Sequence, residues 1–193
     1  MDVGLLILRV VVGLLMIGHG TQKLFGWFEG PGLDGAGGFF ESLGYRPGKR
    51  HATLAGFTEA GAGVLLVLGF LTPLACAALI GVMVNVILAA HAQKGLWNSN
   101  GGFEFPLVLL ASAAALAFTG AGDASLDSAF DWRLSGGGWG VAAVAVGLLT
   151  GLVVVSMRRT EPQPVQESET AVSGQASVTG ADTSVGTRSE RVR

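Results

Sequence analysis

The sequence predicts an all-α membrane protein with a four-helix transmembrane bundle, a fifth C-terminal transmembrane helix and a disordered tail. Half of the residues are hydrophobic and only 13% are charged, against about 25% in a typical soluble domain. The hydrophobic residues form runs that can cross a bilayer, which takes about 20 apolar residues in a helix. These runs lack the alternation of barrel strands, and only helices and closed barrels satisfy their backbone polar groups in lipid. A buried soluble helical core is the less favoured interpretation.

Five apolar runs are the candidate spans, and each predicts one helix. They cover residues 3–24, 52–71, 73–92, 105–121 and 139–157. The first run has the position of a signal peptide, but only Met1 and Asp2 precede it, so it lacks a basic leader. No small-residue cleavage site follows it either. We therefore expect a retained first helix.

The segments between the runs differ in character. Residues 26–50 form a long glycine-rich loop, whose aromatic side chains are expected at the lipid headgroups, with one short interfacial helical turn at 39–43. Residues 71–73 leave room only for a tight hairpin, and a proline is tolerated at a helix start. Residues 120–138 form a loop with three aspartates. The last segment, 160–193, is polar and lacks aromatics, which predicts disorder.

Three parts follow from these features. They are a four-helix membrane domain in residues 1–127, a loop and fifth transmembrane helix in 128–157, and a tail in 158–193. Five spans place the first loop, the loop after the third helix and the tail on one side, and that side holds most of the lysines and arginines. Because cytoplasmic loops carry such an excess, we expect the N-terminus outside and the C-terminus in the cytoplasm.

Small residues recur on the predicted helices. Such faces let helices approach closely in lipid. The first run contains Gly13, Gly18 and Gly20, the second contains Gly56 and Gly63, and the fifth contains Gly147 and Gly151. We expect these residues to pack one bundle internally. A face for a second copy of the chain is the alternative, so an oligomer is also considered.

Ionisable side chains lie within or beside four of the apolar runs, toward one membrane face. They are His19, Lys23, Glu59, His91 and Glu104. A charge in hydrocarbon costs a few kcal/mol or more, so such residues are usually paired or functional. We expect the five to meet in one polar site in the cytoplasmic half of the bundle.

Two interpretations of this cluster compete. In the structural one, Lys23 pairs with Glu104 or Glu59, the histidines bond to backbone carbonyls, and the set holds four helices together. In the functional one, which we favour, the cluster binds or protonates a ligand. Histidine side chains ordinarily have a pKa near neutral, so two of them can transfer protons, which a purely structural cluster does not need. Asn85 and Trp97 are candidate ligand contacts beside it, although Trp97 is equally well an interfacial anchor.

Arg9 stands apart from this cluster. It lies just inside the first predicted helix, near the opposite membrane face. A long cationic side chain at that depth can reach the headgroups. We expect Arg9 to do so, with a role in a polar pathway as the alternative.

Several other functions are disfavoured. Residues 30–35 match the GxGxxG pattern, but no strand precedes them and no βαβ unit surrounds them. The histidines and glutamates have zinc-ligand chemistry without a recognisable metal spacing. Cys76 is the single cysteine, so it cannot form an intramolecular disulfide. The chain has no basic stripe for nucleic acid.

A set of motifs follows in a fixed order through the first two-thirds of the chain. The first helix ends in Gly-His-Gly-Thr-Gln-Lys-Leu-Phe-Gly at 18–26, and the second contains Ala-Gly-Phe-Thr-Glu at 55–59. A hairpin with Gly-Phe-Leu-Thr-Pro follows at 69–73, and Gly-Ala-Gly-Asp-Ala-Ser-Leu-Asp stands at 120–127. This ordered set resembles the DoxX family of small four-helix bacterial membrane proteins. The fifth helix and the tail fall outside the resemblance.

The resemblance implies a direction for function. Relatives include a membrane subunit of a thiosulfate:quinone oxidoreductase, and others are linked to sulfur-stress complexes with soluble enzymes. It implies the bacterial plasma membrane, a quinone as ligand, and soluble redox enzymes as partners on the cytoplasmic face. The resemblance singles out the same five ionisable residues, which are His19, Lys23, Glu59, His91 and Glu104. A non-catalytic anchor for soluble redox enzymes is the second hypothesis, and a small-molecule transporter or proton path is a weaker third.

Overall fold

The computed structural model describes residues 2–159, and every regular element within this range is a helix. The long helices are α1 (Asp2–Phe25), α3 (Gly48–Leu68), α4 (Thr72–Val86), α5 (Glu104–Thr119) and α7 (Gly137–Ser156). The short ones are α2 (Gly32–Ser42), η1 (Ile87–His91), η2 (Ala92–Lys94), η3 (Asn98–Asn100) and α6 (Leu126–Ala129). The predicted disordered tail lies outside the described residues.

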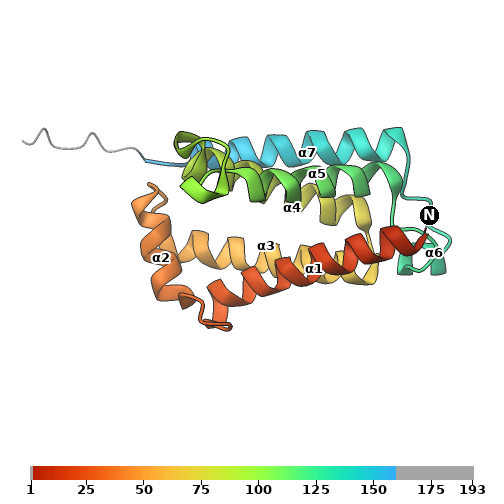
Figure 1. Ribbon diagram of the computed structural model, residues 1–193, viewed down its shortest axis with the longest axis horizontal. Coiled ribbons are helices and arrows are strands. Elements are labelled where there is room, and N and C mark those ends of the chain that lie inside the picture. Colours follow the sequence, from red (N-terminus) through yellow and green to blue (C-terminus); the bar gives the residue numbers. More distant parts are fainter. Residues whose placement is uncertain (1, 160–193) are drawn as a thin grey trace, which may run out of the picture. The chain divides into compact units, whose positions relative to one another are not determined.

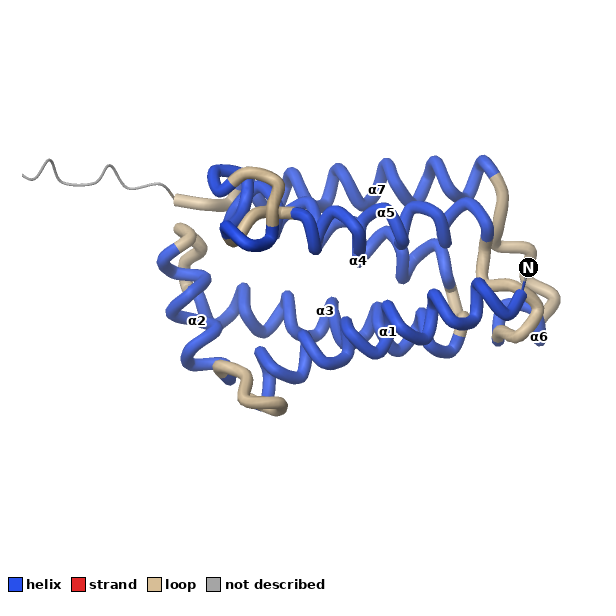
Figure 2. The backbone as a smooth tube through the Cα atoms, viewed as in Figure 1, coloured by secondary structure: helices blue, strands red, loops and turns tan. Residues whose placement is uncertain are grey.

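The long helices form two layers (Figure 1). One layer is α1 packed along α3, and the other is α4, α5 and α7 packed together. The tight turn between α3 and α4 joins the layers, as the tube in Figure 2 shows. α2 lies across one end of the α1–α3 layer, which we call the α2 end. α6 lies near the start of α1, at the α6 end.

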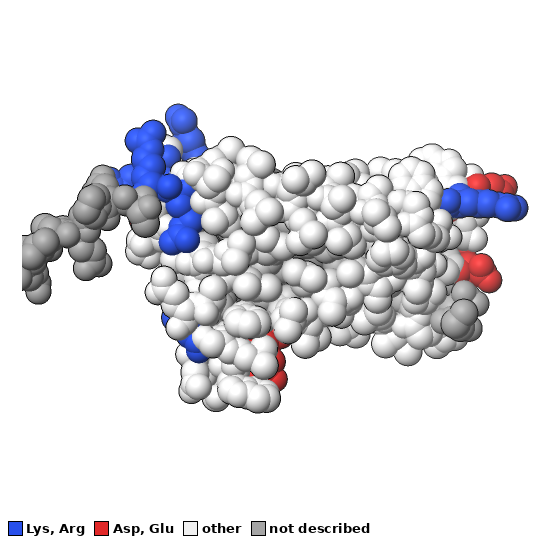
Figure 3. Space-filling view, turned by 90° about the horizontal axis from the view of Figure 1, so that it is seen from above, with Lys and Arg blue, Asp and Glu red and all other residues white. Residues whose placement is uncertain are grey.

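Four helical segments are long and apolar enough to cross a membrane: Val3–Phe25, Gly48–Leu68, Thr72–Lys94 and Gly137–Ser156. They make the chain an all-helical multi-pass membrane protein. α5 has 16 residues, or about 24 Å of helix, which is less than the ~30 Å hydrocarbon core. The predicted fourth crossing therefore stays a prediction. On the face in Figure 3, a wide band without charged atoms separates the two charged ends.

Glycines let α1 and α3 pack with their backbones in contact. A Cβ on Gly20 would lie 2.5 Å from the carbonyl oxygen of Gly56, and one on Gly63 would lie 2.5 Å from that of Gly13. Gly147 and Gly151 do the same for α7, which packs on α4. These glycines therefore pack the bundle internally, as expected.

The turn between α3 and α4 is held by a carboxylate from α6, the short helix beyond α5. Asp127 accepts hydrogen bonds from the backbone N–H of Leu71 at 2.7 Å and of Thr72 at 3.1 Å. The Thr72 hydroxyl donates a third at 2.7 Å. A carboxylate at this place also faces the positive N-terminal end of α4. Asp127 thus fixes the hairpin that joins the two layers.

Arg9 corrects a prediction from the sequence. Its side chain is fully buried and does not reach the headgroups. The guanidinium donates to the carbonyl oxygens of Leu66, in the last turn of α3, at 3.4 Å and of Ala124 at 2.5 Å. The depth of Arg9 along its helix was predictable from the sequence. The sequence did not reveal that the side chain turns toward α3 and that the loop before α6 covers it.

Candidate functional site

Glu59 faces α1 from the middle of α3. It lies three residues after Gly56 and four before Gly63, so it shares the helical face that packs on α1. Its side chain is only 3% exposed. Glu59 therefore points to the glycine-lined interior of the α1–α3 layer rather than to lipid.

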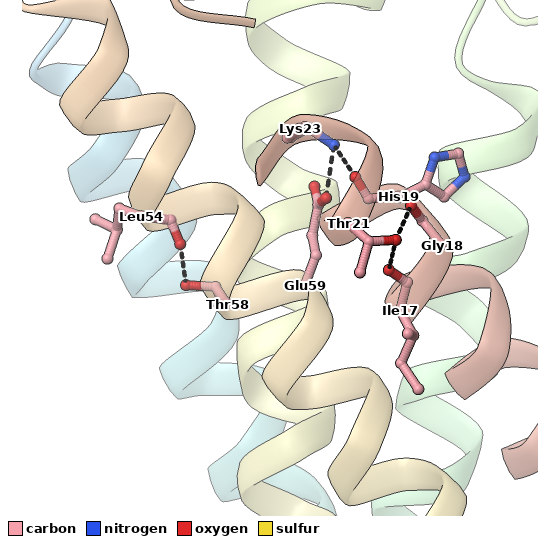
Figure 4. Close-up of polar contacts among 8 residues, drawn as sticks. All are labelled: Ile17, Gly18, His19, Thr21, Lys23, Leu54, Thr58 and Glu59. Atoms are coloured by element: carbon pink, nitrogen blue, oxygen red, sulfur yellow. Dashed lines mark hydrogen bonds and ion pairs between the residues drawn. The ribbon is translucent and has the colours of Figure 1, made fainter. Parts of the chain in front are cut away.

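Lys23, in the last turn of α1, meets this carboxylate (Figure 4). Its Nζ donates to Oε2 of Glu59 at 2.6 Å and to the carbonyl oxygen of His19 at 3.4 Å. Removing one partner of a buried ion pair costs about 3–5 kcal/mol. Of the two pairings considered for Lys23, the structure has the one with Glu59.

The ion pair lies on the wall of a cavity of about 490 Å³. The cavity is bounded by α2, α3, α4 with η1, and α7, and Lys23 reaches it from the last turn of α1. Most of its wall is apolar. The polar side chains in the wall are Lys23, His51, Thr58, Glu59, Asn85, His91 and Thr150. A largely apolar cavity with a few converging polar groups is the usual form of a small-molecule site.

Asn85 is placed on the wall by a buried tyrosine. Tyr45 is fully buried between α2 and α3, and its hydroxyl accepts a 2.5 Å hydrogen bond from Nδ2 of Asn85. Burial raises the pKa of the Tyr45 hydroxyl, although the Asn85 bond and the charge of Arg158 oppose the rise. The phenol therefore stays neutral. Its ring lies 5.1 Å, centroid to centroid, from the imidazole of His51.

His91 closes a π-helical turn that continues α4, an uncommon feature often found at functional sites. Its Nδ1 donates to the carbonyl oxygen of Gly101 at 2.6 Å. This bond fixes the ring beside the cavity that Lys23 and Glu59 also line. His91 and the ion pair therefore line the same cavity.

The remaining predicted site residues lie off the cavity wall. The His19 ring packs edge-on against Phe105 at 6.0 Å, centroid to centroid, and points away from Lys23 in Figure 4. Glu104 accepts a 3.0 Å hydrogen bond from the backbone N–H of Asn98, within the loop that leads into α5. Trp97 is 62% exposed. Of the five ionisable residues expected to meet, Lys23, Glu59 and His91 line the cavity, whereas His19 and Glu104 do not.

Part of the chain is similar to a known family. The model of the DoxX family matches residues 4–92, which is less than half of the chain, and we call the matched segment the DoxX domain. No curated protein and no solved structure matches the chain.

The DoxX domain supplies most of the cavity. It contains α2, α3 and α4, and also every polar wall residue except Thr150. The remaining wall comes from α7, which lies beyond the matched residues. Within residues 2–159, no group of three or more histidine, cysteine, aspartate or glutamate side chains could hold a metal ion.

Sequence reasoning missed His51 and Tyr45. His51 lies near the start of α3, next to charged residues that obscure its relation to the apolar run. A usable signal was the seven-residue spacing from His51 to Thr58, which puts both on one side of the helix. Tyr45 carried no periodic signal, because it lies in the turn between two helices.

Proposed function

We propose that this DoxX protein is a membrane subunit of a redox system and that it binds a quinone in the cavity beside Lys23 and Glu59. The observation that carries the proposal is the buried ion pair on the wall of a largely apolar cavity. A lipid-soluble ring fits apolar walls, and its carbonyl oxygens need hydrogen-bond donors. Lys23 and the imidazole of His51 have such donors.

For quinone reduction, this chain would have to bind the quinone and supply protons to it. Reduction of a quinone to a quinol takes two electrons and two protons. The electrons would come from a soluble redox enzyme docked on the membrane face. The protons would come through Lys23, Glu59 and His91, since ammonium, carboxyl and imidazole groups can all donate and accept protons.

The proposal includes a location. The α2 end would face the cytoplasm of a bacterial cell and the α6 end would face outward, with five crossings in the plasma membrane. The excess of lysine and arginine on the loops of the α2 end supports this orientation. Soluble partners would then reach the membrane next to the cavity.

The experiment compares Glu59→Gln with Glu29→Gln in lipid nanodiscs. The first removes the buried carboxylate, and the second makes the same change at an exposed glutamate in the α1–α2 connection. We expect Glu59→Gln to weaken binding of a decyl-chain benzoquinone roughly tenfold or more and Glu29→Gln to leave it unchanged. Equal binding by both variants, at equal folded yield, would remove the basis for the proposal.

A non-catalytic anchor for soluble enzymes is the second candidate. The local bonds of His91 and Glu104, which each end on nearby backbone, favour it because they need no ligand. In that case deletion of residues 160–193 should abolish capture of partner enzymes, while Glu59→Gln should leave capture and stress resistance intact. Loss of stress resistance in Glu59→Gln with capture preserved speaks for the redox proposal instead.

A further inference from the structure

The cavity changes in polarity along the helix axis. α3 and α4 run antiparallel from their turn, so residues equally far from the turn lie at the same level, as Glu59 and Gly81 do. His51, Asn85 and His91 lie on the α2 side of this level. The wall residues on the side nearer the turn are Leu74, Ala77, Ala78 and Val146. We call these four the apolar extension.

The apolar extension suits a hydrocarbon chain and no polar group. It contains no side chain that can donate or accept a hydrogen bond, and burying a polar group without a partner costs several kcal/mol. Leu74 to Gly81 covers roughly 10 Å of helix. Leu74 and Val146 are both at least half exposed, on the apolar surface that faces lipid. A chain could therefore enter sideways from the bilayer.

α7 provides the outer wall of this extension. Gly147 and Gly151 hold α7 close to Ile80 and Val84 of α4, which places Val146 beside the cavity. The far end of α7 is fixed to the connection between α2 and α3. There Nε of Arg158 donates to the carbonyl oxygen of Leu43 at 2.7 Å, and the N–H of Arg159 donates to that of Gly44 at 2.8 Å.

We infer that the apolar extension holds the hydrocarbon chain of a single-chain amphiphile whose head lies at Lys23 and Glu59, and that Val146 of α7 sets the room for that chain. The inference rests on the proposed ligand site and adds to it the class of ligand and the residue that selects it. Because α7 lies outside the matched DoxX residues, this selectivity belongs to the added helix.

The test compares Val146→Phe with Val153→Phe in nanodiscs. Both residues are exposed valines of α7, but only Val146 lines the cavity. The probes are a bare dimethoxy-methyl benzoquinone ring, the same ring with a decyl chain, and palmitic acid. We expect Val146→Phe to weaken both chain-bearing probes roughly tenfold, since overfilled sites tolerate little added volume, and to spare the bare ring. Val153→Phe should match the wild type with all three.

The outcomes separate this inference from the proposed function. If Val146→Phe weakens palmitic acid and the wild type binds neither quinone, the chain site stands and the quinone proposal fails. If the decyl-chain quinone binds and both valine variants bind it equally, the quinone proposal stands and the chain site is overturned. A wild type that binds no chain-bearing probe, or a Val146→Phe variant that weakens the bare ring equally, also overturns it. Thermal unfolding of each variant checks that the bundle is intact.

Discussion

At the scale of single residues, the ion pair between Lys23 and Glu59 is unequal. Glu59 is 3% exposed, whereas 23% of the Lys23 side chain reaches the surface. A lysine at such a position can extend its ammonium group toward water when it loses its partner. The Glu59 carboxylate, which is buried between α1 and α3, cannot reach water in this way. Lys23 therefore contributes to stability mainly because it neutralises the charge of the buried Glu59 carboxylate.

This inequality predicts the outcome of a double-mutant cycle. Lys23→Met strands Glu59 and should destabilise the protein by about 3 kcal/mol or more, whereas Glu59→Gln should cost about 1 kcal/mol. The double variant should resemble Glu59→Gln rather than the sum of both changes. Thermal unfolding in one detergent measures all four proteins, and a Lys23→Met protein as stable as the wild type would contradict the argument.

The sequence predicted the residues whose signal was a charge inside an apolar run. Lys23, Glu59 and His91 were found in this way, because such groups persist in a membrane only with a partner or a task. His19 and Glu104 gave the same signal, yet each lies off the cavity wall. Depth along a helix is readable from sequence. The direction in which a side chain leaves that helix depends on neighbours that are distant in the chain.

At the scale of elements, helix contacts are set by where glycine is required. In α1, a Cβ on Gly20 would collide with the backbone of α3, whereas a Cβ on Gly18 would have nothing within 4 Å. Gly18 and Gly20 are the two neighbours of His19 in the sequence. The sequence marked both as small residues, and only the packing of α3 distinguishes them.

This difference predicts opposite effects of the same substitution. Gly20→Ala should destabilise the α1–α3 layer by about 1–3 kcal/mol, because backbone atoms cannot move aside as side chains do. Gly18→Ala should be neutral or stabilising by up to about 1 kcal/mol, since alanine favours a helix. Unfolding midpoints in one detergent compare the two variants. A Gly18→Ala protein less stable than the Gly20→Ala protein would contradict the close packing of α1 on α3 at Gly20.

Most helix boundaries followed from simple rules, and the exceptions have physical causes. The second predicted span, 52–71, begins earlier and ends earlier in the structure, at Gly48–Leu68. Gly69 stops this helix in the left-handed conformation, with φ 60°, as glycine commonly does. Helix α2 is longer than the predicted turn at 39–43, and its Gly37 packs on Lys49 of α3 where the sequence indicated a loop.

At the scale of the whole molecule, the two layers give a topology that labelling can test. Ser99 lies in η3 at the α2 end, and Ser135 lies in the connection between α6 and α7. The native thiol of Cys76 is fully buried. A wild-type protein should therefore give no background with a maleimide reagent.

The proposed orientation predicts which added cysteines react in intact cells. A membrane-impermeant maleimide should label Ser135→Cys before lysis, and Ser99→Cys only after lysis. Ser156→Cys, at the end of α7, should behave like Ser99→Cys if five helices cross. Labelling of Ser156→Cys in intact cells would show that α5 or α7 does not cross, and labelling of Ser99→Cys there would reverse the orientation.

The bonds of Arg9 and Asp127 have a mechanical consequence. Together they link four segments at the α6 end: α1, the C-terminus of α3, the start of α4 and the segment after α5. The layers are also linked at the opposite end, where Asn85 bonds to Tyr45 and the residues after α7 bond to the connection between α2 and α3. Any widening between the layers at the α2 end would therefore have to break these bonds first, while the bonds of Arg9 and Asp127 keep the α6 end closed.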